Sequence, residues 1–74
     1  MNLGEMKVGQ RGRISRVDSS QAISQRLLEI GLVEGADCEV IHEAPLSHDP
    51  IAVRVRGSII ALRRAEAALI EVTV

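Results

Sequence analysis

The sequence predicts a small β-barrel, mainly β, of about five strands with one short α-helix and a helical turn before the last strand. Its 74 residues allow a single domain, residues 1–74, with one core. The runs IAVRVR and LIEVTV alternate between apolar and polar residues, which is typical of strands with one buried face. The run RLLEIGLVEG has helical spacing up to its first glycine, and strand-like residues follow its second. A helix this short must dock on the strands, because it is unstable alone.

The first strand is predicted over residues 10–17, QRGRISRV. Ile14 and Val17 are three positions apart and cannot share one face of a regular strand. We therefore expect a bulge or sharp coil near Gly12 or Ser15.

The helix is predicted to follow in roughly three turns, because apolar residues recur at helical spacing as far as Ile30. Asp18, Ser19 and Ser20 precede it and are good N-cap residues, and Asp18 has capping-box spacing to Gln21.

Two glycines are predicted to turn the chain from this helix into the next strand. Gly31 suits the left-handed position after a helix, which lets Leu32 pack back onto Leu27. Gly35 suits the positive-φ position of a type II turn over residues 33–36.

Four further strands and a helical turn complete the predicted barrel. Residues 36–43 form a strand with Cys38 and Val40 inward, and residues 44–50, APLSHDP, form a loop. Residues 51–56 alternate cleanly and lead to a two-residue type II′ turn at Gly57-Ser58. That turn sets two inward pairs opposite each other: Val55 with Ile60, and Val53 with Leu62.

Residues 63–68, RRAEAA, suit a single helical turn before the last strand. That strand places Ile70, Val72 and Val74 on one face. A sheet this small avoids open edges by curling into a barrel, and the helix can cover an open end.

Composition excludes several function classes. The chain has no Phe, Tyr or Trp, and its net charge is −1, so the usual stacking platforms and basic fields of nucleic-acid binders are missing. No apolar run approaches the ~20 residues that a membrane-spanning helix needs. Cys38 is the only cysteine and no apolar leader opens the chain, which predicts a reducing, cytoplasmic location.

No catalytic or metal-binding constellation is predicted. Ser47, His48 and Asp49 are consecutive, but sequence neighbours do not form a catalytic triad, so we expect a polar loop and no enzyme activity. Cys38 and His42 share a predicted strand but lie ~13 Å apart along it, too far to bind one ion. His48 and Asp49 supply two ligands where a tight site needs three or four.

Two surface features remain open to interpretation. Arginines 11, 13, 54 and 56 form either an outward basic stripe for an acidic partner or cross-strand ion pairs with Glu39 and Glu43. Leu32, Val33 and Leu46 all sit where the chain turns. Together they form either an exposed apolar contact patch or parts of the core, with Leu32 stapling the helix end and Leu46 capping the barrel.

Three segments in this order, RLLEIGLVEG, APLSHDPIAVRVRG and IALRRAEAALIEV, resemble the ferrous iron transport protein A (FeoA) family over almost the whole chain, including MNLGEMKVGQRGRI. The residues that match the family's helix corner, loop and C-terminal motifs include Leu27, Gly31, Gly35, Pro45, Pro50 and Gly57. Two positions depart from the family pattern: Glu34, where many members have proline, and Ser58, where a larger residue is common.

The resemblance implies an SH3-like barrel that serves as a cytoplasmic accessory or adaptor protein beside a bacterial membrane Fe(II) transporter of the FeoB type. The implied partner is the transporter's cytosolic GTP-binding part, with no nucleic acid, no cofactor and no membrane insertion. We expect contact residues at the helix corner and nearby loop: Arg26, Leu32, Val33, Glu34 and Leu46. An unpaired edge strand could support a homo-oligomer. The alternative is a metal-responsive regulatory SH3-like domain of the iron-dependent repressor type.

Overall fold

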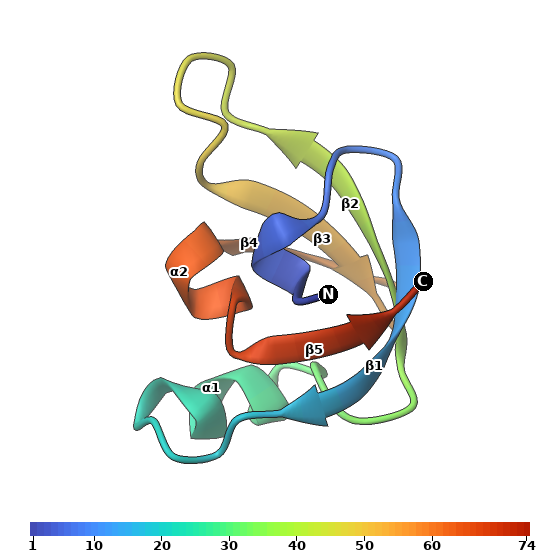
Figure 1. Ribbon diagram of the computed structural model, residues 1–74, viewed down its shortest axis with the longest axis vertical. Coiled ribbons are helices and arrows are strands. Elements are labelled where there is room, and N and C mark those ends of the chain that lie inside the picture. Colours follow the sequence, from blue (N-terminus) through green and yellow to red (C-terminus); the bar gives the residue numbers. More distant parts are fainter.

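The computed structural model describes all residues, 1–74, and shows one five-stranded antiparallel sheet with helical segments (Figure 1). The sheet order is β4-β3-β2-β1-β5. In chain order the elements are η1 (Leu3–Glu5), β1 (Arg11–Val17), α1 (Ile23–Glu29), β2 (Asp37–Glu43), β3 (Ile51–Val55), β4 (Ser58–Leu62), α2 (Arg64–Ala67) and β5 (Ile70–Thr73). The predicted mainly-β class with one short helix and a later helical turn is confirmed.

Two neighbouring strands of the sheet, β1 and β2, are irregular, and this helps the sheet to curl. β1 pairs with β2 through Arg11–Arg13 and with β5 through Arg13–Val17, and the second register shifts between Ile14 and Arg16. The predicted bulge therefore lies at Ser15. A second shift, between Val40 and His42 in β2, is not visible in the sequence pattern. Bulges increase local twist, so both help the sheet to close on itself.

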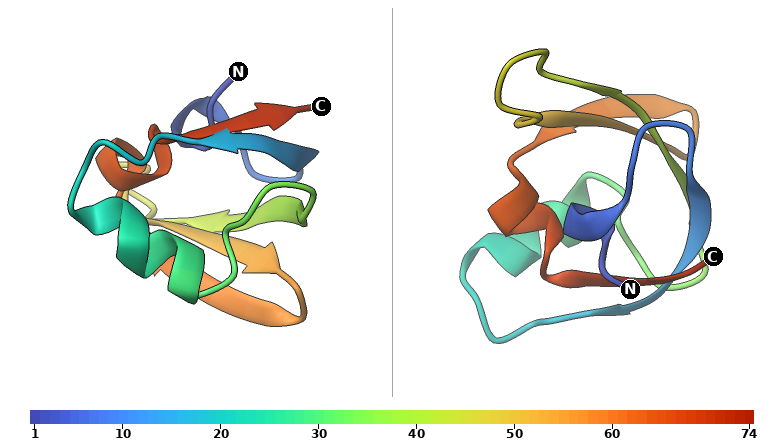
Figure 2. Two further views of the ribbon diagram at one scale, coloured as in Figure 1. Left: turned by 90° about the horizontal axis from the view of Figure 1, so that it is seen from below. Right: turned by 45° about the horizontal axis from the view of Figure 1, so that its top comes forward.

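The two edge strands do not pair with each other, and helical segments fill the space between them. The outer edge of β5 is covered by the chain start, since the Val72 N–H donates to the Met1 carbonyl and Asn2 bridges Glu71. η1 lies against α2 in the middle of the molecule, while α1 runs along an open side of the curled sheet (Figures 1 and 2). The helix thus covers an opening, as predicted.

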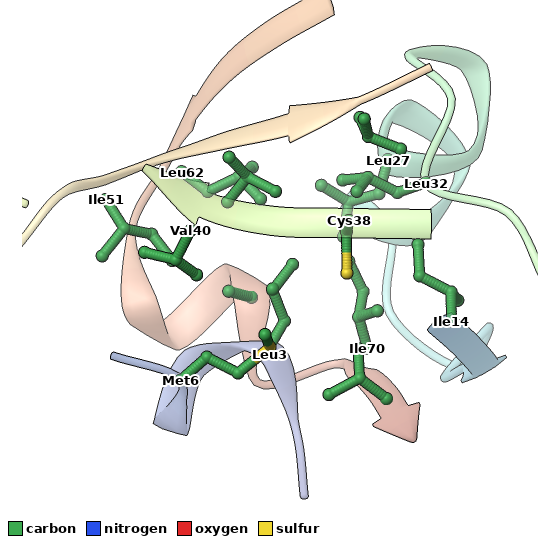
Figure 3. Close-up of a cluster of buried hydrophobic side chains, with 14 of the residues drawn as sticks. Leu3, Met6, Ile14, Leu27, Leu32, Cys38, Val40, Ile51, Leu62 and Ile70 are labelled. Carbon is green, nitrogen blue, oxygen red and sulfur yellow. The ribbon is translucent and has the colours of Figure 1, made fainter. Parts of the chain in front are cut away.

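The core is entirely aliphatic apart from two sulfur-containing side chains (Figure 3). The inward strand residues predicted from alternation are buried: Cys38, Val40, Ile51, Val53, Val55, Ile70 and Val72. Leu3 and Met6 are also fully buried, although the sequence pattern assigns no element to the first nine residues. Val74 was predicted to share the inner face of the last strand, but it lies beyond β5 and is 71% exposed.

The glycine corner forms as predicted. The Gly31 N–H donates to Leu28 and the Leu32 N–H donates to Leu27, the two hydrogen bonds of a Schellman motif, with Gly31 at φ 108°. Gly35 has φ 85°. Ile14 fixes the corner to β1, because its carbonyl accepts from Gly35 at 2.8 Å and its N–H donates to Ala36 at 2.9 Å.

The helix start differs from the prediction. α1 begins at Ile23, so it has about two turns, and Ala22 precedes it without a side-chain cap. Asp18 accepts hydrogen bonds from the Ser20 N–H and Oγ, and its carbonyl accepts from Ser24 Oγ. Asp18 therefore closes a turn of its own and does not cap the helix, because a short side chain can satisfy the nearest free N–H instead.

The β3–β4 register also differs from the prediction. Val55 pairs with Ser58, Val53 with Ile60 and Ile51 with Leu62, so the turn residues are Arg56 and Gly57. Both have positive φ, 50° and 80°, as a type I′ turn requires. A shift of two residues leaves every side chain on the same face, so the apolar pattern cannot detect it. The register places Leu62 opposite Ile51, and both are buried.

The Gly31 conformation generates a test of the corner. We expect Gly31→Ala to lower the free energy of unfolding by about 1–2 kcal/mol, because an L-residue is strained at positive φ. The loss should come from strain alone, since an added Cβ would find its nearest neighbour, Arg56 Cδ, at 3.9 Å. Urea unfolding measures the change. The matched control is D-alanine at the same position, introduced by chemical synthesis, which should be stable at least to the level of glycine. Equal stability of both alanine enantiomers would contradict this account.

Candidate functional site

The predicted contact residues at the helix corner have different exposures. Arg26 on α1 and Glu34 after it are exposed, and neither forms an ion pair. Val33 is half-buried and packs against the core. Leu32 is fully buried, so it staples the helix end and offers no contact surface. We use "helix corner" below for Arg26, Val33 and Glu34.

The loop between β2 and β3 lies at the opposite end of the molecule from the helix corner. In Figure 1 the loop is at the top and α1 at the bottom of the long axis, which measures 30 Å. Leu46 in this loop is 96% exposed, so it does not cap the barrel. The predicted single apolar patch of Leu32, Val33 and Leu46 therefore does not exist, and the loop forms a separate surface.

Arg64 holds this loop in place. Its guanidinium donates to the carbonyls of His48 at 2.7 Å, Gly4 at 3.0 Å and Met6 at 2.9 Å, and lies 3.5 Å from Glu43. Its backbone N–H donates to Asp49 at 2.9 Å. One side chain thus joins the β2–β3 loop, α2 and the N-terminal segment. Sequence reasoning missed this role, because nothing in RRAEAA distinguishes Arg64 from its neighbour.

The side chains of Ser47, His48 and Asp49 all make contacts that stabilise the β2–β3 loop. Ser47 Oγ donates to the Asp49 carbonyl at 2.7 Å, and His48 Nδ1 lies 2.6 Å from Glu43. The Asp49 carboxylate accepts from Arg64. The serine hydroxyl therefore faces backbone and not a base, and the three residues do not form a nucleophile-base relay.

No three His, Cys, Asp or Glu side chains gather into a group that could hold a metal ion. Cys38 is 3% exposed and faces the core, whereas His42 is exposed beyond the β2 irregularity. These two side chains do not share a face of the strand.

Four arginines gather on the outer face of β1, β2 and β3, around a shallow depression of about 580 Å³. Glu39 in the centre lies 3.6 Å from Arg11 and 3.2 Å from Arg54. A second pair joins Arg13 and Asp37 at 3.1 Å. The cross-strand pairing predicted with Glu39 is thus present, whereas Glu43 pairs with His48 and Arg64 instead.

We call this surface the arginine face and define it as Arg11, Arg13, Asp37, Glu39, Arg54 and Arg56. Arg56 forms no ion pair. Four guanidinium groups and two carboxylates give the face a formal charge of +2, although the chain carries −1. The face is therefore a local positive region on a slightly acidic molecule.

Cys38 lies beneath the arginine face with its thiol inside the barrel, near Ile70 (Figure 3). Burial raises the pKa of this thiol, outweighing a hydrogen bond from the Gly12 backbone that lowers it. A thiol that stays protonated is a poor nucleophile and a poor metal ligand. Its role is packing.

None of the helices is long and apolar enough to cross a membrane.

Comparison with known proteins identifies a family for this chain. The model of the FeoA domain family matches residues 1–74. A protein of Porphyromonas gingivalis described as a Fe(2+) transport protein A/Fe(2+) transporter FeoB fusion protein is 39% identical over 72 residues, which cover 97% of this chain. The chain spans only 8% of that relative's length.

Solved structures agree with the family match. The FeoA protein from Chlorobium tepidum is 42% identical with a TM-score of 0.85, over 97% of this chain and 68% of that one. FeoA of Stenotrophomonas maltophilia, an SH3 domain protein complexed with zinc, has a TM-score of 0.87 at 29% identity, over 99% of this chain and 89% of that one. The SH3-like fold class is therefore confirmed.

A manganese-dependent transcriptional repressor also superimposes, with a TM-score of 0.86 at 19% identity over 35% of its own chain. Identity this low shows a shared fold alone. The metal-responsive alternative has weaker support than the FeoA family, from IdeR of T. acidophilum, which is 27% identical with a TM-score of 0.81 over 100% of this chain and 33% of its own.

The Arg64 contacts generate a stability prediction. We expect Arg64→Lys to lower the free energy of unfolding by about 2–3 kcal/mol, because an ammonium cannot donate in the same fork to three carbonyls from two segments. Amide exchange in residues 44–50 should accelerate as the loop loses its anchor. The matched control is Arg63→Lys, since the exposed Arg63 side chain makes no hydrogen bond. Equal effects of the two substitutions would contradict the anchoring role.

The Cys38 pKa generates a prediction about alkaline stability. Because the folded-state pKa is raised, the stabilisation is complete below the unfolded value of ~8.5 and is lost as pH rises from there through the folded pKa. The free energy of unfolding should fall above pH ~8.5 with a slope of at most ~1.4 kcal/mol per pH unit. Urea unfolding between neutral pH and pH ~10 measures this decline. Cys38→Ala should be less stable overall but lack the decline, whereas parallel pH profiles would contradict the assignment.

Proposed function

The chain belongs to the FeoA domain family, and we propose that it is a cytoplasmic accessory protein of ferrous iron transport that binds the cytosolic GTP-binding part of a membrane Fe(II) transporter. In this role it acts by contact and has no catalytic activity of its own. Its partner is a protein and not a nucleic acid.

The fusion relative is the observation that carries this proposal. In that protein a segment 39% identical to this chain is part of the same polypeptide as an FeoB transporter. Covalent linkage keeps two domains at a high effective concentration, which is useful when they act on each other. A separate chain of the same fold must reach its transporter by binding, and it therefore needs exposed contact surfaces.

The side-chain chemistry fits a binding module better than an enzyme. The one thiol is buried with a raised pKa, and the Ser47 hydroxyl donates to a backbone carbonyl. No three metal-ligand side chains gather. The surface instead offers features suited to protein contacts: the helix corner, the loop anchored by Arg64 and the arginine face.

We propose two contact surfaces from the predicted residues. The first is the helix corner, which is followed directly by the turn at Gly35 and Ala36 that two backbone hydrogen bonds fix to Ile14. The second is Leu46, whose apolar side chain is presented to solvent by a loop that Arg64 anchors. Rigid presentation lowers the entropy lost on binding, so both can contribute affinity despite their small area.

The test is an amide NMR titration of the labelled chain with the soluble GTP-binding domain of its transporter. We expect saturable shifts in residues 26–36, in residues 44–50, or in both. Leu46→Ser should weaken binding about tenfold if Leu46 is buried at the contact, since burying a leucine is worth about 1.5–3 kcal/mol. Val74→Ser is the control, because Val74 is also exposed but lies at the chain end. Absence of any shift at saturating concentration would exclude direct binding to this domain.

A further inference from the structure

We propose that the free edge of β4 and the adjacent part of the arginine face bind an extended, acidic segment of a partner protein by strand addition. This site lies outside the contact surfaces proposed above, because it consists only of the sheet edge and the charges beside it. Neither the helix corner nor Leu46 takes part.

The β5 edge of the sheet is covered by another part of the chain, whereas the β4 edge is open. The β5 edge is covered by the first two residues of the chain, through the Val72 to Met1 hydrogen bond and the Asn2–Glu71 bridge. The β4 edge pairs only with β3. Natural proteins usually protect an open edge with lysine, proline or a bulge, and the β4 sequence SIIAL carries none of these.

The hairpin register identifies the backbone groups that remain free. In a two-residue hairpin the pair flanking the turn exchanges both hydrogen bonds, and alternate pairs do so from there. Val55 with Ser58 and Val53 with Ile60 are therefore the bonded pairs. The N–H and C=O groups of Ile59 and Ala61 point away from β3, and a partner strand can bind them.

The side chains at this edge favour an apolar residue in the partner. Ile59 is 62% exposed and lies opposite Arg54 of β3. Ala61 is exposed and lies opposite the small Ala52. A partner strand bound at this edge would contact the Ile59 side chain and the small Ala61 on the outer face of the sheet. Cross-strand side-chain pairs at these positions would contribute to affinity.

The arginines beside this edge favour an acidic residue in the partner segment, at the next position that faces the same side of the sheet. Arg54 shares Glu39 with Arg11, and Arg56 has no carboxylate partner. Gly57, at the end of the edge, lines the same depression and has no side chain to block access. In an antiparallel partner, the residue opposite Gly57 lies two positions after the residue opposite Ile59, on the same face. A glutamate there can reach Arg54 or Arg56.

A protein segment fits this surface better than a nucleic acid. The arginines are interleaved with Asp37 and Glu39, which would repel a phosphate backbone, and no aromatic side chain is available for stacking. Backbone hydrogen bonds along a sheet edge are the recognition chemistry of extended peptides.

The probe is the acetylated peptide Leu-Thr-Val-Thr-Glu-Thr-Glu. We expect saturable binding to the full chain, with slowed amide exchange at Ile59 and Ala61. N-methylation of the valine should abolish binding, because in the bonded register its N–H donates to the Ile59 carbonyl. N-methylation of the next threonine is the control and should change affinity little, because that N–H points away from β4.

Two protein variants separate strand addition from general electrostatic attraction. Arg54→Gln and Arg11→Gln each remove one positive charge and one ion pair to Glu39. Only Arg54 adjoins the β4 edge. We expect Arg54→Gln to weaken binding about fivefold and Arg11→Gln less than twofold. Replacing both peptide glutamates by glutamine should weaken binding to the native chain and to Arg11→Gln, but much less to Arg54→Gln.

Four results would overturn the proposal. One is equal loss for Arg54→Gln and Arg11→Gln, which would indicate attraction to the whole face. Another is equal loss for the two N-methylated peptides, which would exclude strand addition. The third is a dimer in sedimentation velocity that Ile59→Lys converts to monomer, because a second copy of the chain would then occupy the edge. Tighter binding of a single-stranded oligonucleotide than of the peptide would also contradict it.

Discussion

The paired hydrogen bonds between Ile14 and the turn at Gly35 and Ala36 determine how the rest of the structure is arranged. They fasten the end of the α1 corner to the middle of β1, immediately before the Ser15 bulge. From this point β2 must start antiparallel beside the first half of β1, while the second half of β1 is left to pair with β5. β1 therefore pairs first with β2 and then with β5, which requires a curved sheet and not a flat one. The left-handed glycines are needed because only they allow the chain to return to Ile14 within so few residues.

This curvature allows a small chain to bury a core without aromatic side chains. Leucine, isoleucine and valine fill less volume per residue, so the interior must be closed by many elements. Leu3 and Met6 enter from the chain start, Leu27 and Leu32 from the helix, and Ala67 from α2. The helical segments are therefore structural parts of the barrel. The Arg64 side chain joins two of these segments, η1 and α2, to the β2–β3 loop by donating hydrogen bonds to backbone carbonyls. The loop is therefore held by the same segments that close the core.

The sequence predicts features set by local chemistry or by periodicity, and fails where two arrangements satisfy the same pattern. The Schellman end at Gly31 and the burial of Val53 and Val55 follow from conformational freedom and alternation. The β3–β4 register does not, because sliding β4 by two residues keeps every side chain on its face. Asp18 illustrates the same problem: its carboxylate can cap a helix or close a turn, and only the tertiary position of the helix start decides.

The candidate contact surfaces were harder to predict than the core for a related reason. Burial of Leu32 and exposure of Leu46 follow the same sequence signal, an apolar residue at a turn, and differ only because one turn is folded onto β1 and the other extends beyond the sheet. The arginine face required knowledge of which strands are neighbours before its charges could be counted together. Arginines 11 and 54 are far apart in the chain, yet both lie against Glu39, so neither is fully neutralised. A carboxylate shared in this way leaves a positive surface that is weak toward phosphate backbones but complementary to a few well-placed acidic side chains. Such a surface favours a specific protein partner over general attraction to anions.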